Sequence, residues 1–398
     1  MSARDLASPQ SGDPARPTQR AALAVAATLC VASLALLLWP AGSFEALDDG
    51  PALHRGSLTA LPGGDALLLQ GDLQPGTARG AIFSAETRAW TPIAAPKGLS
   101  HHHTATQLEG DRVLVVEGVE QVHAWLLDTT RGQATRLPNP PSPHGPRHTA
   151  TRLQDGRVLI AGGIDGTRDD LVAQAELSIF DPATNAWSAA GVMSSPRYAH
   201  TATLLEDGSV FIVGGIEPGN VQLPPRADRF DPGTGKVEHL PGPSWPRAGH
   251  QAAALPDGTV LICGGAEALN SAEAPLRLAE VFDLEKGAWR DVGAMRHGRR
   301  DFAAVTLADG RVLVVGGWWR DDNRSFGGYG HQVYSIRERL LGIPKRSQLD
   351  RTEVFDPDWG RWAAGPRLQL KREEPRAVRA GGGVLVHGDG AWPEWASF

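Results

Sequence analysis

Arginines recur just before one repeated strand of the chain, and they are candidates for binding an anion. They are Arg147, Arg197, Arg247, Arg299 and Arg376. A guanidinium group makes charge-assisted and bidentate hydrogen bonds, so a ring of these side chains could hold an anionic ligand. The same groups could instead hydrogen-bond the carbonyls of neighbouring loops. We place Arg197, Arg247 and Arg299 among the candidate ligand-binding residues.

Histidines begin the same strand in four repeats, at His103, His148, His200 and His250. Metal ligands must converge on one ion at about 2 Å, whereas one histidine per repeat disperses them. The local cluster of residues 101–103 is a weak candidate because neighbouring residues on a strand point in opposite directions. We therefore expect a structural role for the histidines, with no metal and no cofactor.

One long connection, from Trp318 to about Asp350, carries the other candidate ligand-binding residues. They are Trp318, Trp319, Arg320, Tyr329 and Tyr334. Aromatic side chains and arginine are the usual anchors of recognition surfaces. The alternative is an Ω-like loop that only covers part of the fold.

A repeated pair of hairpins must position these residues. Residues 148–163 read HTATRLQDGRVLIAGG, and five further stretches repeat this pattern, with a partial copy at 375–388. An Asp-Gly turn between apolar runs predicts a hairpin whose second strand is buried on both faces. An aromatic residue and then a tryptophan follow seven residues apart, as in Phe180 to Trp187, which predicts a second hairpin. Each repeat thus supplies four strands.

The connections between these strands differ in how much their lengths vary. From the tryptophan position to the next first strand the interval is thirteen residues in four repeats, as from Trp90 to His103. From the last glycine to the aromatic residue it takes 12, 9, 17, 15, 17 and 38 residues. Insertions in repeat proteins collect on one face, which is often the binding face.

The repeat resembles the kelch repeat, over about residues 54–390. Four Gly-Gly pairs carry the resemblance, together with Trp187, Trp289 and Trp362; they are 162–163, 214–215, 264–265 and 316–317. The family implies an all-β propeller with one four-stranded blade per repeat. We favour seven blades over six, with residues 391–398 as third strand and residues 43–50 as fourth strand of the last blade. Closing the ring in this way removes open sheet edges.

No catalytic residue is assigned from the sequence. The chain lacks a nucleotide-binding glycine loop, an HExxH motif and a nucleophile elbow. Copper radical oxidases on kelch-like propellers need a Cys–Tyr crosslink, and no cysteine lies near Tyr198, Tyr329 or Tyr334 in the sequence. Enzyme activity stays open, with a binding role favoured.

The N-terminal residues predict export. Residues 1–20 have the composition of a disordered tail, here cytoplasmic, and residues 21–39 carry no charge. Residues 21–40 are therefore predicted to form a hydrophobic helix that is either a transmembrane anchor or a signal peptide cleaved near 41–43. Arg16 and Arg20 before this run place residues 43–398, the propeller domain, outside the cytoplasm, so that it is periplasmic or extracellular, and secreted if cleaved. The net charge of −6 implies no nucleic-acid partner.

The sequence therefore predicts an exported, membrane-anchored kelch protein that binds a protein or glycan partner through one loop face. The alternative is a carbohydrate-active enzyme, similar to a sugar epimerase or mutarotase of the kelch type. It would use a central arginine with Asp321 or Asp322 as general base. The identity of the ligand stays open.

Overall fold

The computed structural model describes residues 43–47, 56–71, 79–100, 102–118, 122–165, 172–217, 225–267, 275–320, 346–372, 374–388 and 391–398. Contacts divide the chain into Met1–Gly42 and Ser43–Phe398, and the described residues all belong to the second unit. The predicted helix over residues 21–40 lies outside them. No helix among the described residues is long and apolar enough to cross a membrane.

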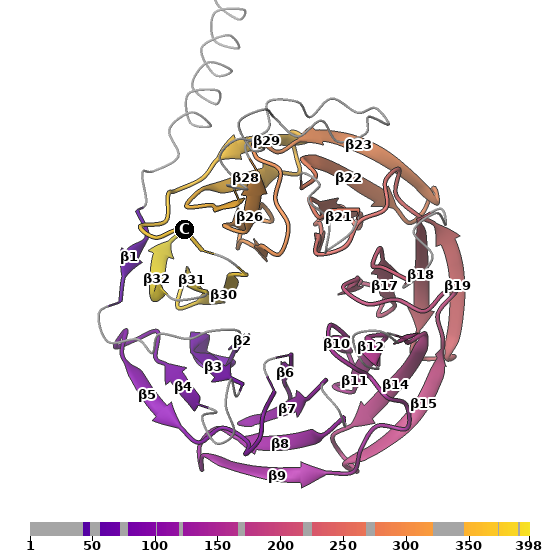
Figure 1. Ribbon diagram of the computed structural model, residues 1–398, viewed down its shortest axis with the longest axis vertical. Coiled ribbons are helices and arrows are strands. Elements are labelled where there is room, and N and C mark those ends of the chain that lie inside the picture. The colour runs from indigo at the N-terminus through magenta and orange to yellow at the C-terminus, as the bar shows by residue number, and fades with distance from the viewer. Residues whose placement is uncertain are drawn as a thin grey trace, which may run out of the picture. The chain divides into compact units, whose positions relative to one another are not determined.

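The described residues form seven antiparallel four-stranded sheets arranged as blades around a ring (Figure 1). Blade 1 contains β2 (Gly56–Ala60), β3 (Ala66–Gln70), β4 (Arg79–Phe83) and β5 (Trp90–Ile93). Blade 2 contains β6 (Thr104–Gln107), β7 (Arg112–Val116), β8 (Ala124–Asp128) and β9 (Gln133–Leu137). Blade 3 contains β10 (Thr149–Arg152), β11 (Val158–Ala161), β14 (Glu176–Asp181) and β15 (Ala186–Val192). Blade 4 contains β16 (Thr201–Leu204), β17 (Val210–Val213), β18 (Arg226–Asp231) and β19 (Lys236–Pro241).

The remaining blades follow the same order. Blade 5 contains β20 (Gln251–Ala254), β21 (Val260–Cys263), β22 (Leu278–Asp283) and β23 (Ala288–Ala294). Blade 6 contains β24 (Ala303–Thr306), β25 (Val312–Val315), β28 (Thr352–Asp356) and β29 (Arg361–Ala364). Blade 7 contains β30 (Arg376–Ala380), β31 (Gly383–Gly388), β32 (Ala391–Ser397) and β1 (Glu45–Ala46). The all-β propeller with seven blades is confirmed, and the six-bladed alternative is wrong.

The repeated hairpin is the inner half of each blade, as predicted. The first strands contact one another in a closed circle, β2–β6–β10–β16–β20–β24–β30 and back to β2. The second strands are buried along their length, because apolar side chains on both faces meet the neighbouring blades. In the turn of blade 3, Gly156 has a φ of 89°, and the Asp155 carboxylate accepts a hydrogen bond from the Arg157 amide. The Asp-Gly turn is thus satisfied locally.

The Gly-Gly pair ends the second strand because neither position has room for a side chain. Gly264 and Gly265 have φ values of 65° and 92°. A Cβ on Gly264 would lie 2.6 Å from the Arg299 carbonyl oxygen, and one on Gly265 would lie 2.9 Å from that of Ala248. Only glycine combines this backbone with such close approach. The pair therefore lets the loops between blades pack onto the strand ends.

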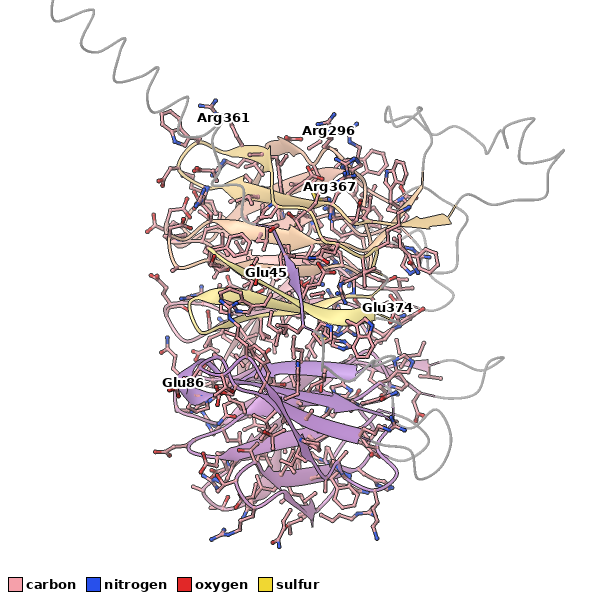
Figure 2. The ribbon with its side chains drawn as sticks, turned by 90° about the vertical axis from the view of Figure 1, so that its left-hand side faces the viewer. Glu45, Glu86, Arg296, Arg361, Arg367 and Glu374 are labelled. Atoms are coloured by element: carbon pink, nitrogen blue, oxygen red, sulfur yellow. The ribbon has the colours of Figure 1, made fainter. Side chains whose placement is uncertain are left out.

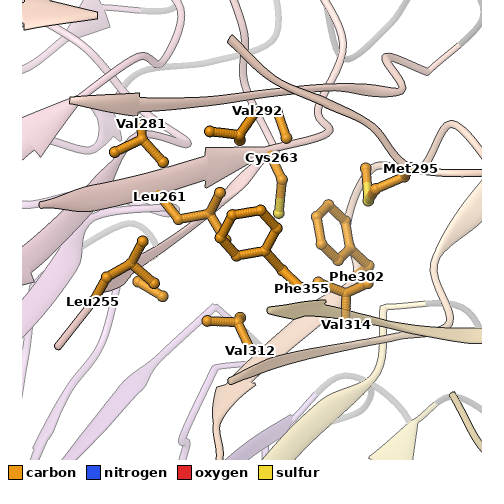
Figure 3. Packing of buried hydrophobic residues seen from close by; sticks show 12 residues of the cluster. Leu255, Leu261, Cys263, Val281, Val292, Met295, Phe302, Val312, Val314 and Phe355 are labelled. Atoms are coloured by element: carbon orange, nitrogen blue, oxygen red, sulfur yellow. The ribbon is translucent and has the colours of Figure 1, made fainter. Parts of the chain in front are cut away.

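The outer half of the blade is held by the aromatic pair found in the sequence. Phe180 lies opposite Trp187 in the β14–β15 register, with ring centroids 5.0 Å apart, and three other blades repeat this pair. The Trp187 indole N–H also donates to the Pro138 carbonyl of the preceding blade, at 2.9 Å. Apolar side chains fill the space between blades. Figure 3 shows this for blades 5 and 6, where Phe355 and Val312 pack against Leu261 and Val281.

Residues from both ends of the propeller sequence close blade 7. Strand β32 pairs with β31 on one side and with β1 on the other, where Glu45 lies opposite Trp395. Figure 2 shows Glu45 on the purple ribbon of β1 beside the yellow strands. Phe44 is fully buried, and its carbonyl accepts a hydrogen bond from the Gln369 amide at 2.8 Å. The predicted closure of the ring by both segments is confirmed.

Candidate functional site

Two sets of connections share one face of the propeller. They are the second-to-third strand connections and the links between blades. They are hydrogen-bonded to each other at β-bridges, such as Tyr198 with Ile216 and Arg300 with Trp318. We call this side the loop face. The hairpin turns lie on the other side, and Figure 2 shows Glu374 of the loop face opposite Glu86 and Arg361 of the turns.

Arg197, Arg247 and Arg299 lie in the interior and not on the loop face. Each guanidinium forms a buried ion pair with a carboxylate on the third strand of its blade; the partners are Asp228 at 3.1 Å, Glu280, and Glu353 at 2.7 Å. Each also donates to the carbonyl of the first glycine of the Gly-Gly pair. Burial lowers the pKa of all three arginines, while the paired carboxylates act to raise it. These contacts give the three arginines a role in holding the loops to the blades.

Two related pairs have no local signal in the sequence. In blade 7, Arg372 donates to Glu394 at 2.7 Å, and both side chains are fully buried. In blade 3 the same place is taken by neutral groups, because His144 contacts the Ser178 hydroxyl at 2.7 Å and the Gly162 carbonyl at 3.1 Å. Burial lowers the pKa of His144 to about 4. Blades 3 to 7 therefore each have a buried polar or ionic contact at this place.

The histidines, here called the ring histidines (His103, His148, His200 and His250), join neighbouring blades. Each imidazole Nε2 lies 2.8 to 3.0 Å from a hydroxyl on the first strand of the preceding blade; the hydroxyls belong to Ser57, Thr104, Thr149 and Thr201. The Nδ1 of His148 lies 2.9 Å from the Gly145 carbonyl, so Nδ1 donates and Nε2 accepts. The expected structural role of these histidines is confirmed by these contacts.

A cavity of about 540 Å³ opens on the axis of the ring. Its rim carries one residue from each of six blades, two positions before the first strand begins. We call this set the mouth ring: His102, Arg147, Ala199, Gly249, Asp301 and Glu374. Four of its non-glycine members have a positive φ, which is 62° at Arg147 and 49° at Asp301. Non-glycine residues held in this conformation cluster at ligand-binding sites. The mouth ring is therefore the candidate functional site.

The charges of the mouth ring are divided between its two sides. Arg147 of blade 3 reaches Asp301 of blade 6, with Nη1 and Oδ1 3.5 Å apart. Arg300 lies 3.9 Å from the same carboxylate. Burial raises the pKa of Asp301, with Glu374 adding to this effect and Arg147 opposing it. Arg376 also lines the cavity. Arg147 and Arg376 thus differ from the interior arginines with which the sequence grouped them.

The long connection of blade 6 begins on the loop face. Trp318–Arg320 forms strand β26, which pairs with β27 (Arg346–Gln348). The Trp319 ring meets the His297 imidazole edge-on, with centroids 5.8 Å apart. Tyr329, Tyr334, Asp321 and Asp322 lie outside the described residues. Sequence reasoning missed Asp301 and Glu374; the position just before each first strand was the available signal, and its residue type changes in every repeat.

Comparisons with known proteins agree with this fold. The model of the KLHDC2/KLHL20/DRC7 Kelch-repeats domain matches residues 101–317, more than half of the chain. No curated protein sequence matches the chain significantly. Two solved structures share the fold. One is a fungal alcohol oxidase of the AA5 family in complex with copper, with a TM-score of 0.67 and 14% identity over 90% of this chain and 76% of the oxidase. The other is YjhT, with a TM-score of 0.53 and 15% identity over 75% of this chain and 93% of YjhT.

The copper of that oxidase has no counterpart among the residues described here. Over the described ranges, no group of three or more His, Cys, Asp and Glu side chains is placed to hold a metal ion. Cys263 is buried among apolar side chains of blades 5 and 6, and burial raises the pKa of its thiol to about 12. These residues do not fit a copper site.

Proposed function

The chain belongs to the kelch-repeat family, and we propose that it is an exported, membrane-anchored propeller that binds a protein partner through its loop face. Kelch domains generally mediate protein–protein interaction. The cavity at the mouth ring is the observation that carries the proposal, because it opens where the connections of variable length gather. A rigid scaffold that presents variable loops is the usual arrangement of a binding protein.

The aromatic residues at the base of the long connection extend this surface. Trp318 and Trp319 are both partly exposed. The bridge from Trp318 to Arg300 places the start of this connection next to Asp301 of the mouth ring. Aromatic anchors beside a charged cavity are typical of interface hot spots. The expected partner therefore contacts both the mouth ring and strand β26.

Capture from an envelope extract tests the binding surface. Immobilised protein should lose its partner when Trp319 is replaced by Ala, or when a short Gly-Ser turn joins Arg320 to Arg346 in place of residues 321–345. These two residues face each other in the β26–β27 register, so the turn leaves the propeller intact. The control is Trp359→Ala, which removes a half-exposed tryptophan from the turn between β28 and β29, on the opposite face of the same blade. Equal loss with the control, or undiminished capture by both loop variants, would contradict the proposal. Digestion of the extract with glycosidases separates a glycan partner from a protein.

The membrane anchor rests on the sequence of residues 21–39. An uncharged run of this length is about as long as a bilayer core is thick. Intact protein should stay in the membrane pellet during alkaline extraction, and external protease should digest the propeller in spheroplasts. Release of a mature chain that begins near residue 43 would show a cleaved signal peptide instead. Protection of the propeller from external protease would contradict export.

A carbohydrate-active enzyme is the second candidate, and one observation favours it. Asp301 lies in a polar cavity beside Arg147, and burial raises the pKa of its carboxyl group. A carboxyl group tuned in this way suits general acid–base chemistry on a sugar. Nuclear magnetic resonance of neutral and acidic hexoses should then show faster anomer exchange with the protein, and Asp301→Asn should abolish the effect. Unchanged exchange rates over the panel would exclude this candidate.

A further inference from the structure

The ion pair between Arg147 and Asp301 spans the opening of the cavity. The two residues are 154 positions apart and belong to blades 3 and 6. Blades 4 and 5 separate them on one side of the ring, and there the mouth ring carries only Ala199 and Gly249. No large mouth-ring side chain therefore lies along this arc. The pair forms a chord across the opening.

Backbone hydrogen bonds along the same arc hold the two ends of this chord. The Ala199 amide donates to the Arg147 carbonyl at 3.1 Å, and the Gly249 amide donates to the Ala199 carbonyl at 3.2 Å. The Asp301 amide donates to the Gly249 carbonyl at 2.9 Å. The positive φ of all four residues aligns their peptides around the rim. Because the backbone is fixed, only side-chain rotation of Arg147 or Asp301 can open the chord.

The ion pair is weak enough to be displaced. Its single N–O contact is long at 3.5 Å, and the Arg147 side chain is about one-third exposed, whereas that of Asp301 is 12% exposed. Burial and the neighbouring Glu374 carboxylate both disfavour the charged form of Asp301. Partly exposed pairs of this kind contribute little net stability. Arg147 could therefore exchange Asp301 for another carboxylate at small cost.

We propose that Arg147 is an anion-binding residue of the mouth, that Asp301 is its internal competitor, and that a ligand carboxylate must displace Asp301 to enter. This inference deepens the proposed function, because the displaced pair lies at the centre of the loop face. Arg147, and not the interior arginines Arg197, Arg247 and Arg299, is then the residue that recognises the anion. An acidic side chain or a chain terminus of the partner supplies the required group.

Thiol labelling tests the role of the Arg147–Asp301 pair in the absence of a partner. The Ala199→Cys substitution places a thiol on the rim between the two residues, and Cys30→Ser removes one of the two cysteines of the sequence. Cys263 stays unreactive because it is buried and its thiol pKa is raised to about 12. The probes are methanethiosulfonates with a neutral methyl group or an anionic sulfonatoethyl group. Rates are corrected for the thiolate fraction of the introduced cysteine.

Changes to the Arg147–Asp301 pair should alter the labelling rates of the two probes differently. Asp301→Asn and Arg147→Gln should each raise the neutral-probe rate severalfold, because each opens the chord, and the double variant should raise it no further. Only Asp301→Asn should favour the anionic probe over the neutral one, because Arg147 is then present and unpaired. Glu86→Gln is the control, because it removes an exposed carboxylate on the opposite, turn side of the propeller, and it should leave the neutral-probe rate unchanged. Neutral-probe rates that none of the variants alters would overturn the proposal, whatever the capture experiments show. Circular dichroism melting confirms that each variant is folded.

Discussion

Each ring histidine needs its neutral imidazole, and this sets a pH limit on the ring. The Nε2 of His148 accepts a hydrogen bond from the Thr104 hydroxyl, and a protonated ring could not accept it. Burial lowers the pKa of His148 to about 4 and that of His250 to about 3. Residue type and spacing predicted this structural role, because the four histidines repeat with the strand. They did not predict Asp301, whose neighbours in the mouth ring differ in type from blade to blade.

The pH dependence of unfolding checks the histidine contacts. An unfolded histidine binds a proton below a pKa of about 6.5, whereas folded His148 does so only near pH 4. Stability is therefore lost as the pH falls from about 6.5 towards 4, by on the order of 3 kcal/mol for His148.

The variant His148→Phe with Thr104→Val copies the phenylalanine that blade 6 has at this position, Phe302. Urea unfolding near pH 7 and near pH 4.5 should show a smaller loss of stability for this variant than for the wild type. An equal loss in both proteins would show that His148 does not titrate in this way.

At the scale of strands and connections, the sequence predicted the hairpins but not the ion pairs that tie loops to them. The Asp-Gly turns, the Gly-Gly ends and the Phe–Trp pairs are local patterns, and each recurs in the structure where it was expected. Glu280 is different, because it lies on β22 at a position that reads as an ordinary strand residue. It meets Arg247 only because the register sets Glu280 opposite Ile262. Register between distant strands carries no local signal.

The interior arginine pair of blade 5 gives a prediction at this scale. Replacing Glu280 by Leu leaves the Arg247 charge buried without its partner, which should cost about 3–5 kcal/mol of unfolding free energy. Replacing both, with Arg247→Met and Glu280→Leu, should cost clearly less, because no unpaired charge then stays in the interior. Blade 2 likewise has an uncharged residue, Trp125, at the corresponding strand position. Urea unfolding of the three proteins measures this difference. A double variant as unstable as Glu280→Leu would contradict it.

The molecule as a whole is a ring that its two terminal segments close. Predicting that closure required only the count of strands in the last repeat, because a blade with two missing strands would leave an open edge. The partner could not be predicted in this way, because binding depends on rim residues that differ between repeats. The fold could therefore be predicted almost completely and the mouth ring hardly at all.

Truncation tests the closure. A chain of residues 43–398 keeps β1, whereas a chain of residues 48–398 loses β1 and the buried Phe44. The longer chain should melt at the same temperature as a wild-type chain, while the shorter one should be destabilised by at least the ~3–5 kcal/mol expected for deleting a buried phenylalanine. Thermal melting followed by circular dichroism compares them, with Phe44→Ala in the longer chain as an intermediate. Equal melting temperatures would mean that β1 does not hold the ring.

The central claim is that the loop face, and not the turn face, meets the partner. A photo-crosslinking amino acid placed at Trp319 or at Trp359 distinguishes the faces, because both tryptophans belong to blade 6 and lie on opposite sides of it. Irradiation of intact cells should give a crosslinked adduct from position 319 and from the mouth-ring position 199, with none from position 359. An adduct from position 359 alone would contradict the account.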